Sequence, residues 1–397
     1  MLGLPSWLLI VPVLGFLIFV HELGHFLTAK WFGIKITEFG FGFPPRIFGI
    51  RYGETTYTVN WIPLGGFVRM VGEEDPSELR SFARQTVFKR VIVLVSGSVV
   101  NLILPIVIFT ILFTTPQNVV VGEVMISGVA PGSPAAAAGL RPGDTILSVD
   151  RHRIDNHVDL IQRVMVKLGN ATRLTVRQGS IVSGLRVSPE FSAVETVRVV
   201  PRFNPPDLTV VETVSNPEKE VSLVEARRYN AELGIGDTLT QGAVGIMVGT
   251  TNPRVIKRSH YLWDAVPMSV QRMRDILAIS KNSIVRWASG GPDPGLAGPI
   301  GIAQVTGEVA KAGISPVFEL MAVISISLGI VNLLPIPALD GGRLVFVLLE
   351  WVRRGKRISP EREGLVHLIG FVVLISFIVL MSYRDVVRIL NGDTLIR

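Results

Sequence analysis

The stretch LIFVHELGHFLTAK (residues 17–30) places two histidines and a glutamate in the middle of an apolar run. Each ionisable group at bilayer depth costs on the order of 2.5–3.5 kcal/mol, so these groups need a shared compensation. On a helix, His21 and His25 project from one face because they lie four residues apart. Glu22 lies about 100° further round, within reach of a metal-activated water without being a ligand. HELGH therefore fits H-E-x-x-H, two zinc ligands and a general base.

The composition favours a membrane protein. Hydrophobic residues make up 48% of the 397-residue chain. Hydropathy predicts four transmembrane spans, and a long polar region separates the second from the third. The predicted spans cover about residues 7–28, 91–114, 318–350 and 365–383.

The distribution of charge predicts the orientation of these spans. Basic residues cluster between the first two spans and before the fourth, so the positive-inside rule places both loops in the cytoplasm. The termini and the polar central region then lie outside. We interpret the net charge of +7 as topology and lipid headgroup contact, not nucleic-acid binding. The chain has no cysteine, which excludes disulfides and thiol catalysis.

A catalytic zinc needs a third protein ligand, and Asp340 is the best candidate. It lies in NLLPIPALDGG (residues 332–342) and is the only acid in its apolar stretch. Pro335 and Pro337 break the helix there and free backbone groups that other parts of the protein must satisfy. Taken alone, the segment also fits a kinked helix whose aspartate faces a water-filled crevice.

HELGH and NLLPIPALDGG resemble the two signatures, HExxH and NxxPxPxLDG, of the site-2 protease family of intramembrane zinc metalloproteases. Shorter similarities to the family are TVNWIPLGGFVRM (58–70), SGSVVNLIL (96–104) and GPIGIA (298–303). The resemblance implies a multi-pass enzyme of the bacterial inner membrane, with Zn²⁺ as cofactor and its active site near the cytoplasmic side. It implies zinc ligands at His21, His25 and Asp340, a catalytic acid/base at Glu22, and a hydrogen-bonding residue near the substrate at Asn332. Some members carry a further asparagine at the position of Ser327, whose hydroxyl can still donate one hydrogen bond to the substrate.

The same resemblance implies single-span membrane proteins as substrates. Anti-sigma factors and signal-peptide remnants, cut in regulated intramembrane proteolysis, are the expected examples. A helical substrate must unwind first, because its backbone groups are closed by hydrogen bonds. TTYTVNWIPLGGFVRMVG (55–72) predicts a β-hairpin at 54–72 around a Pro-Leu-Gly-Gly break. Dipped into the membrane, its edge, with Gly65 and Gly66, would bind extended substrate by β-strand addition. Without the resemblance, an ordinary cytoplasmic hairpin is an equal interpretation.

The polar central region predicts a folded domain outside the membrane. ISGVAPGSPAAAAGLRPGDTILSVDRHRIDN (126–156) resembles the core of a PDZ domain, which we expect over 117–203. This domain would either capture peptides or exclude substrates with bulky outer domains. Residues 204–240 predict a linker or insertion, and QGAVGIMVG (241–249) a returning strand. Residues 261–291 predict an amphipathic helix on the outer membrane face or a fifth partial span.

Together these features predict a polytopic α-helical membrane protein with four transmembrane helices, a membrane-associated β-hairpin and an inserted extracytoplasmic α+β PDZ domain. The predicted parts are 1–116 and 314–397 for the two halves of the membrane core, 117–203 for the PDZ domain, and 204–313 for the linker, returning strand and amphipathic helix. The non-enzymatic alternative is a membrane scaffold that binds peptides through the PDZ domain. Glu22 argues against it, because a structural zinc site needs no free carboxylate beside the metal.

Overall fold

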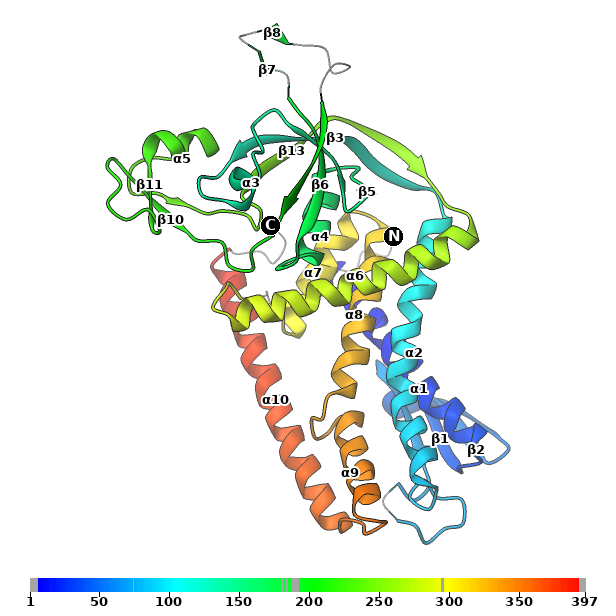
Figure 1. Cartoon of the computed structure of the whole chain (residues 1–397). Helices are drawn as coiled ribbons and strands as arrows, with labels where there is room; N and C mark the ends of the chain where they lie inside the picture. Colours follow the sequence, from blue (N-terminus) through cyan, green and yellow to red (C-terminus); the bar gives the residue numbers. More distant parts are fainter. Residues whose placement is uncertain are drawn as a thin grey trace. The chain divides into compact units, whose positions relative to one another are not determined.

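The computed structural model describes residues 6–73, 75–179, 181–182, 185–186, 193–293 and 296–392. The chain forms two compact units. The helical unit comprises Met1–Leu112, Leu262–Met273 and Gly295–Arg397, and the sheet unit comprises Phe113–Tyr261 and Arg274–Pro294. The predicted combination of apolar helices with β-structure is confirmed (Figure 1).

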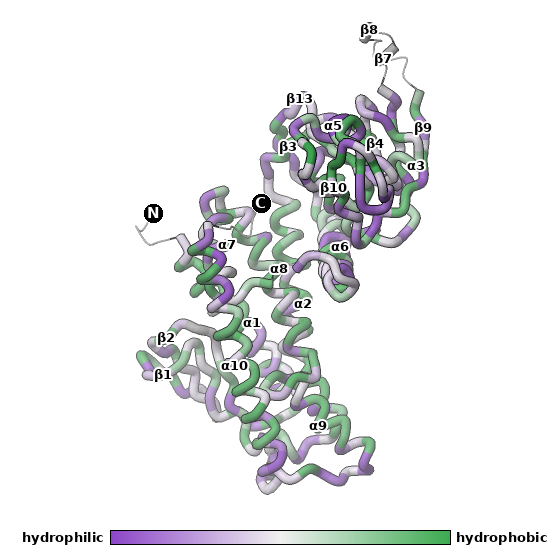
Figure 2. Tube along the Cα trace, turned by 90° about the vertical axis from the view of Figure 1, so that its left-hand side faces the viewer, coloured by the Kyte–Doolittle hydropathy of each residue, from purple (hydrophilic) through white to green (hydrophobic). Residues whose placement is uncertain are grey.

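The helical unit contains long apolar helices and one small sheet. Four stretches of the described chain are long and apolar enough to cross a membrane, namely Ser6–Trp31, Val87–Thr114, Ile314–Leu333 and Pro360–Leu390. Figure 2 colours α2 and α10 largely as hydrophobic. The elements are η1 (Ser6–Leu9), α1 (Ile10–Trp31), β1 (Ile36–Tyr52), β2 (Thr55–Met70), α2 (Val87–Thr114), α7 (Pro299–Lys311), α8 (Ile314–Leu333), α9 (Asp340–Val352) and α10 (Pro360–Leu390); α6 (Leu262–Ala288) contributes to both units.

The apolar stretch predicted as a span at 318–350 is divided into two helices. α8 ends at Leu333 and α9 begins at Asp340. Pro335 and Pro337 lie in the connection, where proline can neither donate a backbone hydrogen bond nor fit a helix interior. In Figure 1, α9 follows α8 after this break. The break places Asp340 in the first turn of a new helix, where the helix dipole favours a carboxylate.

Helices α1, α2 and α9 are held together by one core and one buried ion pair. Arg90 of α2 lies 2.6 Å from Glu350 of α9, and both side chains are only 10% exposed. Arg357 also donates to Glu350, at 3.0 Å. Removing one partner of such a buried pair is costly because it strands the other charge. The core comprises Phe26, Ala29, Ile34, Ile36, Phe39, Phe82, Val93, Leu94 and Val347.

The predicted β-hairpin at 54–72 is wrong in its pairing. Strand β2 does not fold back on itself at the Pro-Leu-Gly-Gly break, because residues of β1 lie between its two halves. Phe39, for example, pairs with Tyr57 on one side and with Val68 on the other. Gly40 permits this close approach, since a Cβ there would lie 2.4 Å from the Phe67 ring. Gly40, Gly42, Pro44 and Pro45 lower the strand propensity of this part of β1, so its sequence does not stand out as a strand.

The sheet unit is built around a six-stranded sheet. Its strand order is β13-β3-β4-β6-β9, and β5 pairs with β4. Strand β13 pairs with β3, so this sheet includes chain beyond the predicted limit of 203. Residues 246–249 of the returning strand predicted at 241–249 lie in β13, and residues 241–245 precede it. The elements are β3 (Gln117–Val129), α3 (Pro134–Ala137), β4 (Thr145–Val149), β5 (His152–Arg153), α4 (His157–Val166), β6 (Thr172–Arg177), β7 (Ile181–Val182), β8 (Leu185–Arg186), β9 (Val194–Val199) and β13 (Ile246–Arg258).

Residues 204–240, predicted as a linker or an insertion, contain a second small sheet, which a linker would not form. Strand β10 (Leu208–Val211) pairs with β11 (Glu220–Ser222) and with β12 (Thr238–Leu239), and α5 (Leu223–Tyr229) follows β11. The strands are two to four residues long, too short for an alternating pattern to stand out among the prolines. Their core comprises Ala130, Leu208, Val210, Val221, Ala226 and Leu239.

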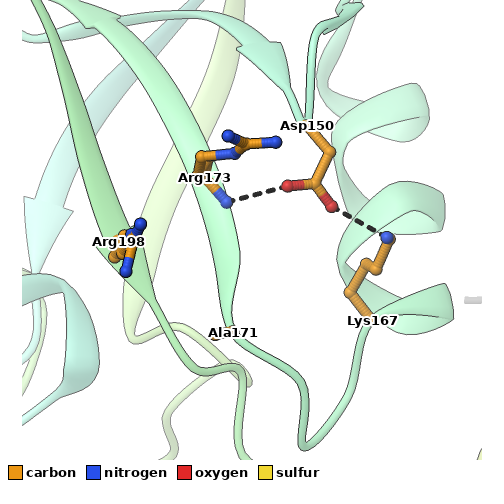
Figure 3. Close-up of a pocket in the computed structure, with 5 residues that line it drawn as sticks. All are labelled: Asp150, Lys167, Ala171, Arg173 and Arg198. Carbon is orange, nitrogen blue, oxygen red and sulfur yellow. Dashed lines mark hydrogen bonds and ion pairs between the residues drawn. The ribbon is translucent and has the colours of Figure 1, made fainter.

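A hollow in the sheet unit is lined by Asp150, Lys167, Ala171, Arg173 and Arg198 (Figure 3). The Lys167 ammonium lies 2.8 Å from one oxygen of Asp150, and the Arg173 backbone N–H donates to the other at 3.0 Å. Partial burial alone would raise the pKa of Asp150. The Lys167 and Arg173 contacts outweigh it and hold the pKa of this carboxyl below its usual value.

The lowered pKa of Asp150 predicts that the sheet unit loses stability in acid. A carboxyl with a lowered folded-state pKa stabilises the fold above its unfolded pKa of about 3.9, and this contribution is lost as the pH falls further. We expect Asp150→Asn to speed amide hydrogen exchange in β4 and β6 of the full chain at pH 6, and the difference from wild type to shrink below pH 4. Arg198→Gln, on β9, is the control. A difference that does not depend on pH would contradict the prediction.

Candidate metal centre

Three predicted ligands converge on one point. Nε2 of His21 lies 2.9 Å from Oδ2 of Asp340, and Nε2 of His25 lies 3.1 Å from the same oxygen. The two Nε2 atoms are 3.1 Å apart. Both histidines are 5% exposed. Helix α1 supplies two adjacent turns of one face, and the break before α9 brings Asp340, 319 residues after His21, to that face.

The donor set and its spacing fit a zinc ion. Nitrogen and oxygen ligands lie about 2.0–2.1 Å from zinc, so in a tetrahedral site they lie about 3.3 Å from one another. The three distances here are a little shorter and allow one ion to contact all three atoms. Two imidazoles and a carboxylate also leave a fourth position open, as hydrolytic zinc sites require.

The outer nitrogens of both imidazoles have neighbours that orient the rings. Nδ1 of His25 donates to the Val93 carbonyl at 2.7 Å, which leaves the Nε2 lone pair facing the cluster. The amide of Asn101 lies 3.4 Å from Nδ1 of His21. Oδ1 of Asn101 is buried without a hydrogen-bond partner among the described residues. Rotating the amide by 180° would let Oδ1 accept from Nδ1 and leave Nε2 for a metal.

Glu22 lies between the histidine cluster and the small sheet. The backbone of Val68 in β2 lies near its carboxyl. Gly66 is close by, since a Cβ on this residue would lie 3.6 Å from Cγ of Glu22. The sheet therefore passes the carboxylate that the sequence predicts as the acid/base.

Gly97 is a site residue that the sequence reasoning missed. A Cβ there would lie 2.4 Å from Nε2 of His25 and 2.9 Å from Nε2 of His21. Gly24 of α1 faces the same part of α2, because a Cβ on this residue would lie 2.7 Å from the Ser96 carbonyl oxygen. Small residues thus let α1 and α2 approach closely, as in other membrane helix pairs. The available signal was the four-residue spacing of Gly97 and Asn101, which places both on one face of α2.

The remaining predicted site residues differ in their placement. Asn332 is half-buried in the last turn of α8, before the break that leads to Asp340. Gly65 has a φ of +94° and packs against Ile18 of α1, where a Cβ would lie 2.7 Å from that side chain. Ser327 is exposed, and its hydroxyl donates to the Val323 carbonyl of its own helix at 3.1 Å. The structure does not bring Ser327 to the cluster.

Two histidines one helical turn apart, a carboxylate from a second helix and an adjacent glutamate are the parts of a hydrolytic metalloenzyme. A profile of Peptidase family M50 matches residues 9–377. The chain belongs to this family. The predicted family and the predicted class of enzyme, a site-2-type metalloendopeptidase, are confirmed, and the four apolar helices make it a membrane protein.

Relatives match over nearly the whole chain. A candidate zinc metalloprotease of Clostridium perfringens is 31% identical, with 94% of this chain and 95% of the relative covered. A candidate zinc metalloprotease of Clostridium acetobutylicum is 28% identical, with 96% and 98% covered. Zinc metalloprotease RasP of Geobacillus kaustophilus is 27% identical, also with 96% and 98% covered.

Proposed function

We propose that this enzyme is a zinc-dependent endopeptidase that hydrolyses peptide bonds within or near the transmembrane segments of single-span proteins. The observation that carries the proposal is the His21, His25 and Asp340 cluster beside Glu22, on a helix apolar enough to span a membrane. Ionisable residues at that depth are costly and mark functional sites, and this group has the donors and the carboxylate that metal-assisted hydrolysis needs.

His21, His25 and Asp340 would hold the zinc, the metal in the names of the three relatives. When bound, zinc supplies Lewis-acid activation of water and of the scissile carbonyl. The Val93 carbonyl orients the His25 imidazole toward the cluster, and Asn101, with its amide rotated, would orient His21 in the same way. Glu22 takes the proton from the attacking water and returns a proton to the leaving nitrogen.

The sheet supports a role in holding unwound substrate. In the described pairings, residues 66–70 pair only with β1, and Glu22 lies beside Gly66 and Val68. A substrate strand added at this edge would have its backbone satisfied while its carbonyls pass Glu22. Gly65 and Gly66 allow close backbone approach, and Asn332 would donate a hydrogen bond to the substrate carbonyl.

The remaining assignments follow from the charge pattern and the resemblance. We place the enzyme in the bacterial inner membrane, with the cluster near the cytoplasmic side and the sheet unit outside. Its substrates would be anti-sigma factors or signal-peptide remnants in regulated intramembrane proteolysis. The GLRPGD segment (139–144) supports a PDZ domain in the sheet unit, which either filters or recruits substrates.

Metal removal tests the proposal directly. We expect the purified full chain in detergent to cleave a single-span substrate, to lose this activity on chelation, and to regain it with one equivalent of Zn²⁺. A substrate with an added folded outer domain tests the role of the PDZ domain. If the domain filters substrates, this substrate should be cleaved more slowly; if it recruits them, the cleavage rate should not fall. A chain that binds zinc stoichiometrically but cleaves no single-span substrate would favour the scaffold alternative.

A further inference from the structure

We infer that His367 of α10 is a positioning residue for Asp340. The inference rests on the proposed zinc site and extends it to a helix that supplies no ligand. Nδ1 of His367 accepts a hydrogen bond from the backbone N–H of Ala338 at 2.9 Å. Ala338 lies two residues before Asp340, in the connection between α8 and α9. In the sequence, His367 stands alone in the fourth span, too isolated to be a ligand.

Ala338 is held in an unfavourable backbone conformation. Its φ is +77°, in the left-handed region that residues with a Cβ seldom adopt. Such a conformation persists only where the surroundings enforce it, and the hydrogen bond to His367 is one such restraint. The turn it produces directs the chain from Pro337 into α9, and so sets where the Asp340 carboxylate points.

Helix α10 packs directly on the same connection. A Cβ on Gly370 would lie 2.3 Å from Cβ of Pro337 and 2.8 Å from its carbonyl oxygen. Gly370 and His367 lie three residues apart, on one face of α10. The His367 ring also lies 5.4 Å from the ring of Phe346 in α9. Two positions on one face of α10 thus contact Pro337 and Ala338, the residues at which the chain turns.

These contacts stand out because little else of α10 is buried, apart from the contact near its C-terminal end where Asp385 accepts from the Gly301 backbone N–H of α7. In the apolar 18-residue segment of α10, 6% of the residues are buried, against 44% in the corresponding segment of α2. A helix that served only as an anchor would have no need of a glycine fitted to Pro337 or of a polar side chain directed at Ala338. We therefore assign α10 the role of bracing the loop that carries the third ligand.

The test compares zinc affinities of full-length variants, measured by competition with a chromophoric chelator. We expect His367→Leu to weaken zinc binding about tenfold or more, in the range known for residues that orient metal ligands. His367→Asn should bind nearly as well as wild type, because its Oδ1 can accept at the place of Nδ1. Ala338→Gly added to His367→Leu should also restore binding, because glycine adopts a positive φ without restraint.

Ser376→Ala is the matched control, since it removes from α10 a hydroxyl that bonds only within its helix in the described contacts. Wild-type affinity in His367→Leu would overturn the inference while leaving the zinc site intact. If His367→Leu binds zinc weakly and neither His367→Asn nor the added Ala338→Gly restores binding, the effect comes from packing of the ring. That result would also overturn the inference. A wild-type chain that binds no zinc would instead refute the proposed function.

Discussion

Glu22→Gln should abolish cleavage while the protein keeps its zinc. Glutamine has nearly the same shape but cannot take a proton from water, so we expect the rate of peptide hydrolysis to fall about 10²–10⁴-fold. Zinc should remain stoichiometric, because the three ligand atoms of His21, His25 and Asp340 lie within 4.8 Å of one another without any contribution from Glu22. The measurement is cleavage of a single-span substrate by purified protein in detergent, with metal content determined on the same samples.

Asp340→Ala provides the contrast to this variant. It removes a ligand and should lower both zinc content and activity, whereas Glu22→Gln should lower activity alone. Loss of zinc in Glu22→Gln would make Glu22 a ligand and refute its role as the acid/base. Full activity with zinc bound would place the proton transfer on another residue.

Gly97→Ala should disrupt the metal site by adding one methyl group. The new Cβ would lie 2.4 Å from Nε2 of His25, closer than any stable contact, and the facing atoms belong to two buried rings on α1. Either ring must turn away, or α2 must withdraw from α1. We expect zinc affinity to fall about 10–100-fold, as for other changes that misorient metal ligands, and cleavage to fall with it.

Gly364→Ala is the matched control for this change. Gly364 is also helical, in α10, and a Cβ there meets nothing within 4 Å. Alanine is a better helix former than glycine, so the control should fold at least as well as wild type. Normal zinc binding in Gly97→Ala would mean that α1 and α2 lie further apart than the structure has them.

The candidate ligands could be predicted from the sequence, but the packing of α2 against them could not. His21, Glu22 and His25 follow from helical spacing within a single turn, and Asp340 from the scarcity of acids in an apolar stretch. Gly97 lies in a segment whose similarity to the family is visible, but a glycine has no side chain to indicate a role. Its importance arises only when α2 meets α1.

The small sheet shows a second limit of sequence patterns. The alternation in 55–62 predicts a strand, yet alternation does not identify the partner of a strand. Residues 36–43 contain Gly40 and Gly42, which lower the strand propensity of β1. In the structure the same Gly40 allows Phe67 and Thr58 to approach from both sides. The glycines that make β1 hard to predict from the sequence also allow it to lie between the two halves of β2.

The separation of the ligands along the chain bears on how the enzyme is made. His21 and His25 enter the membrane early in synthesis, but Asp340 follows His21 by 319 residues. At about 5–20 residues per second, a ribosome needs roughly 15–60 s to add that length. Through that interval the nascent chain lacks Asp340, the residue that we propose as its third zinc ligand. If Asp340 is the third zinc ligand, as proposed here, a chain that ends before α9 cannot assemble the metal site.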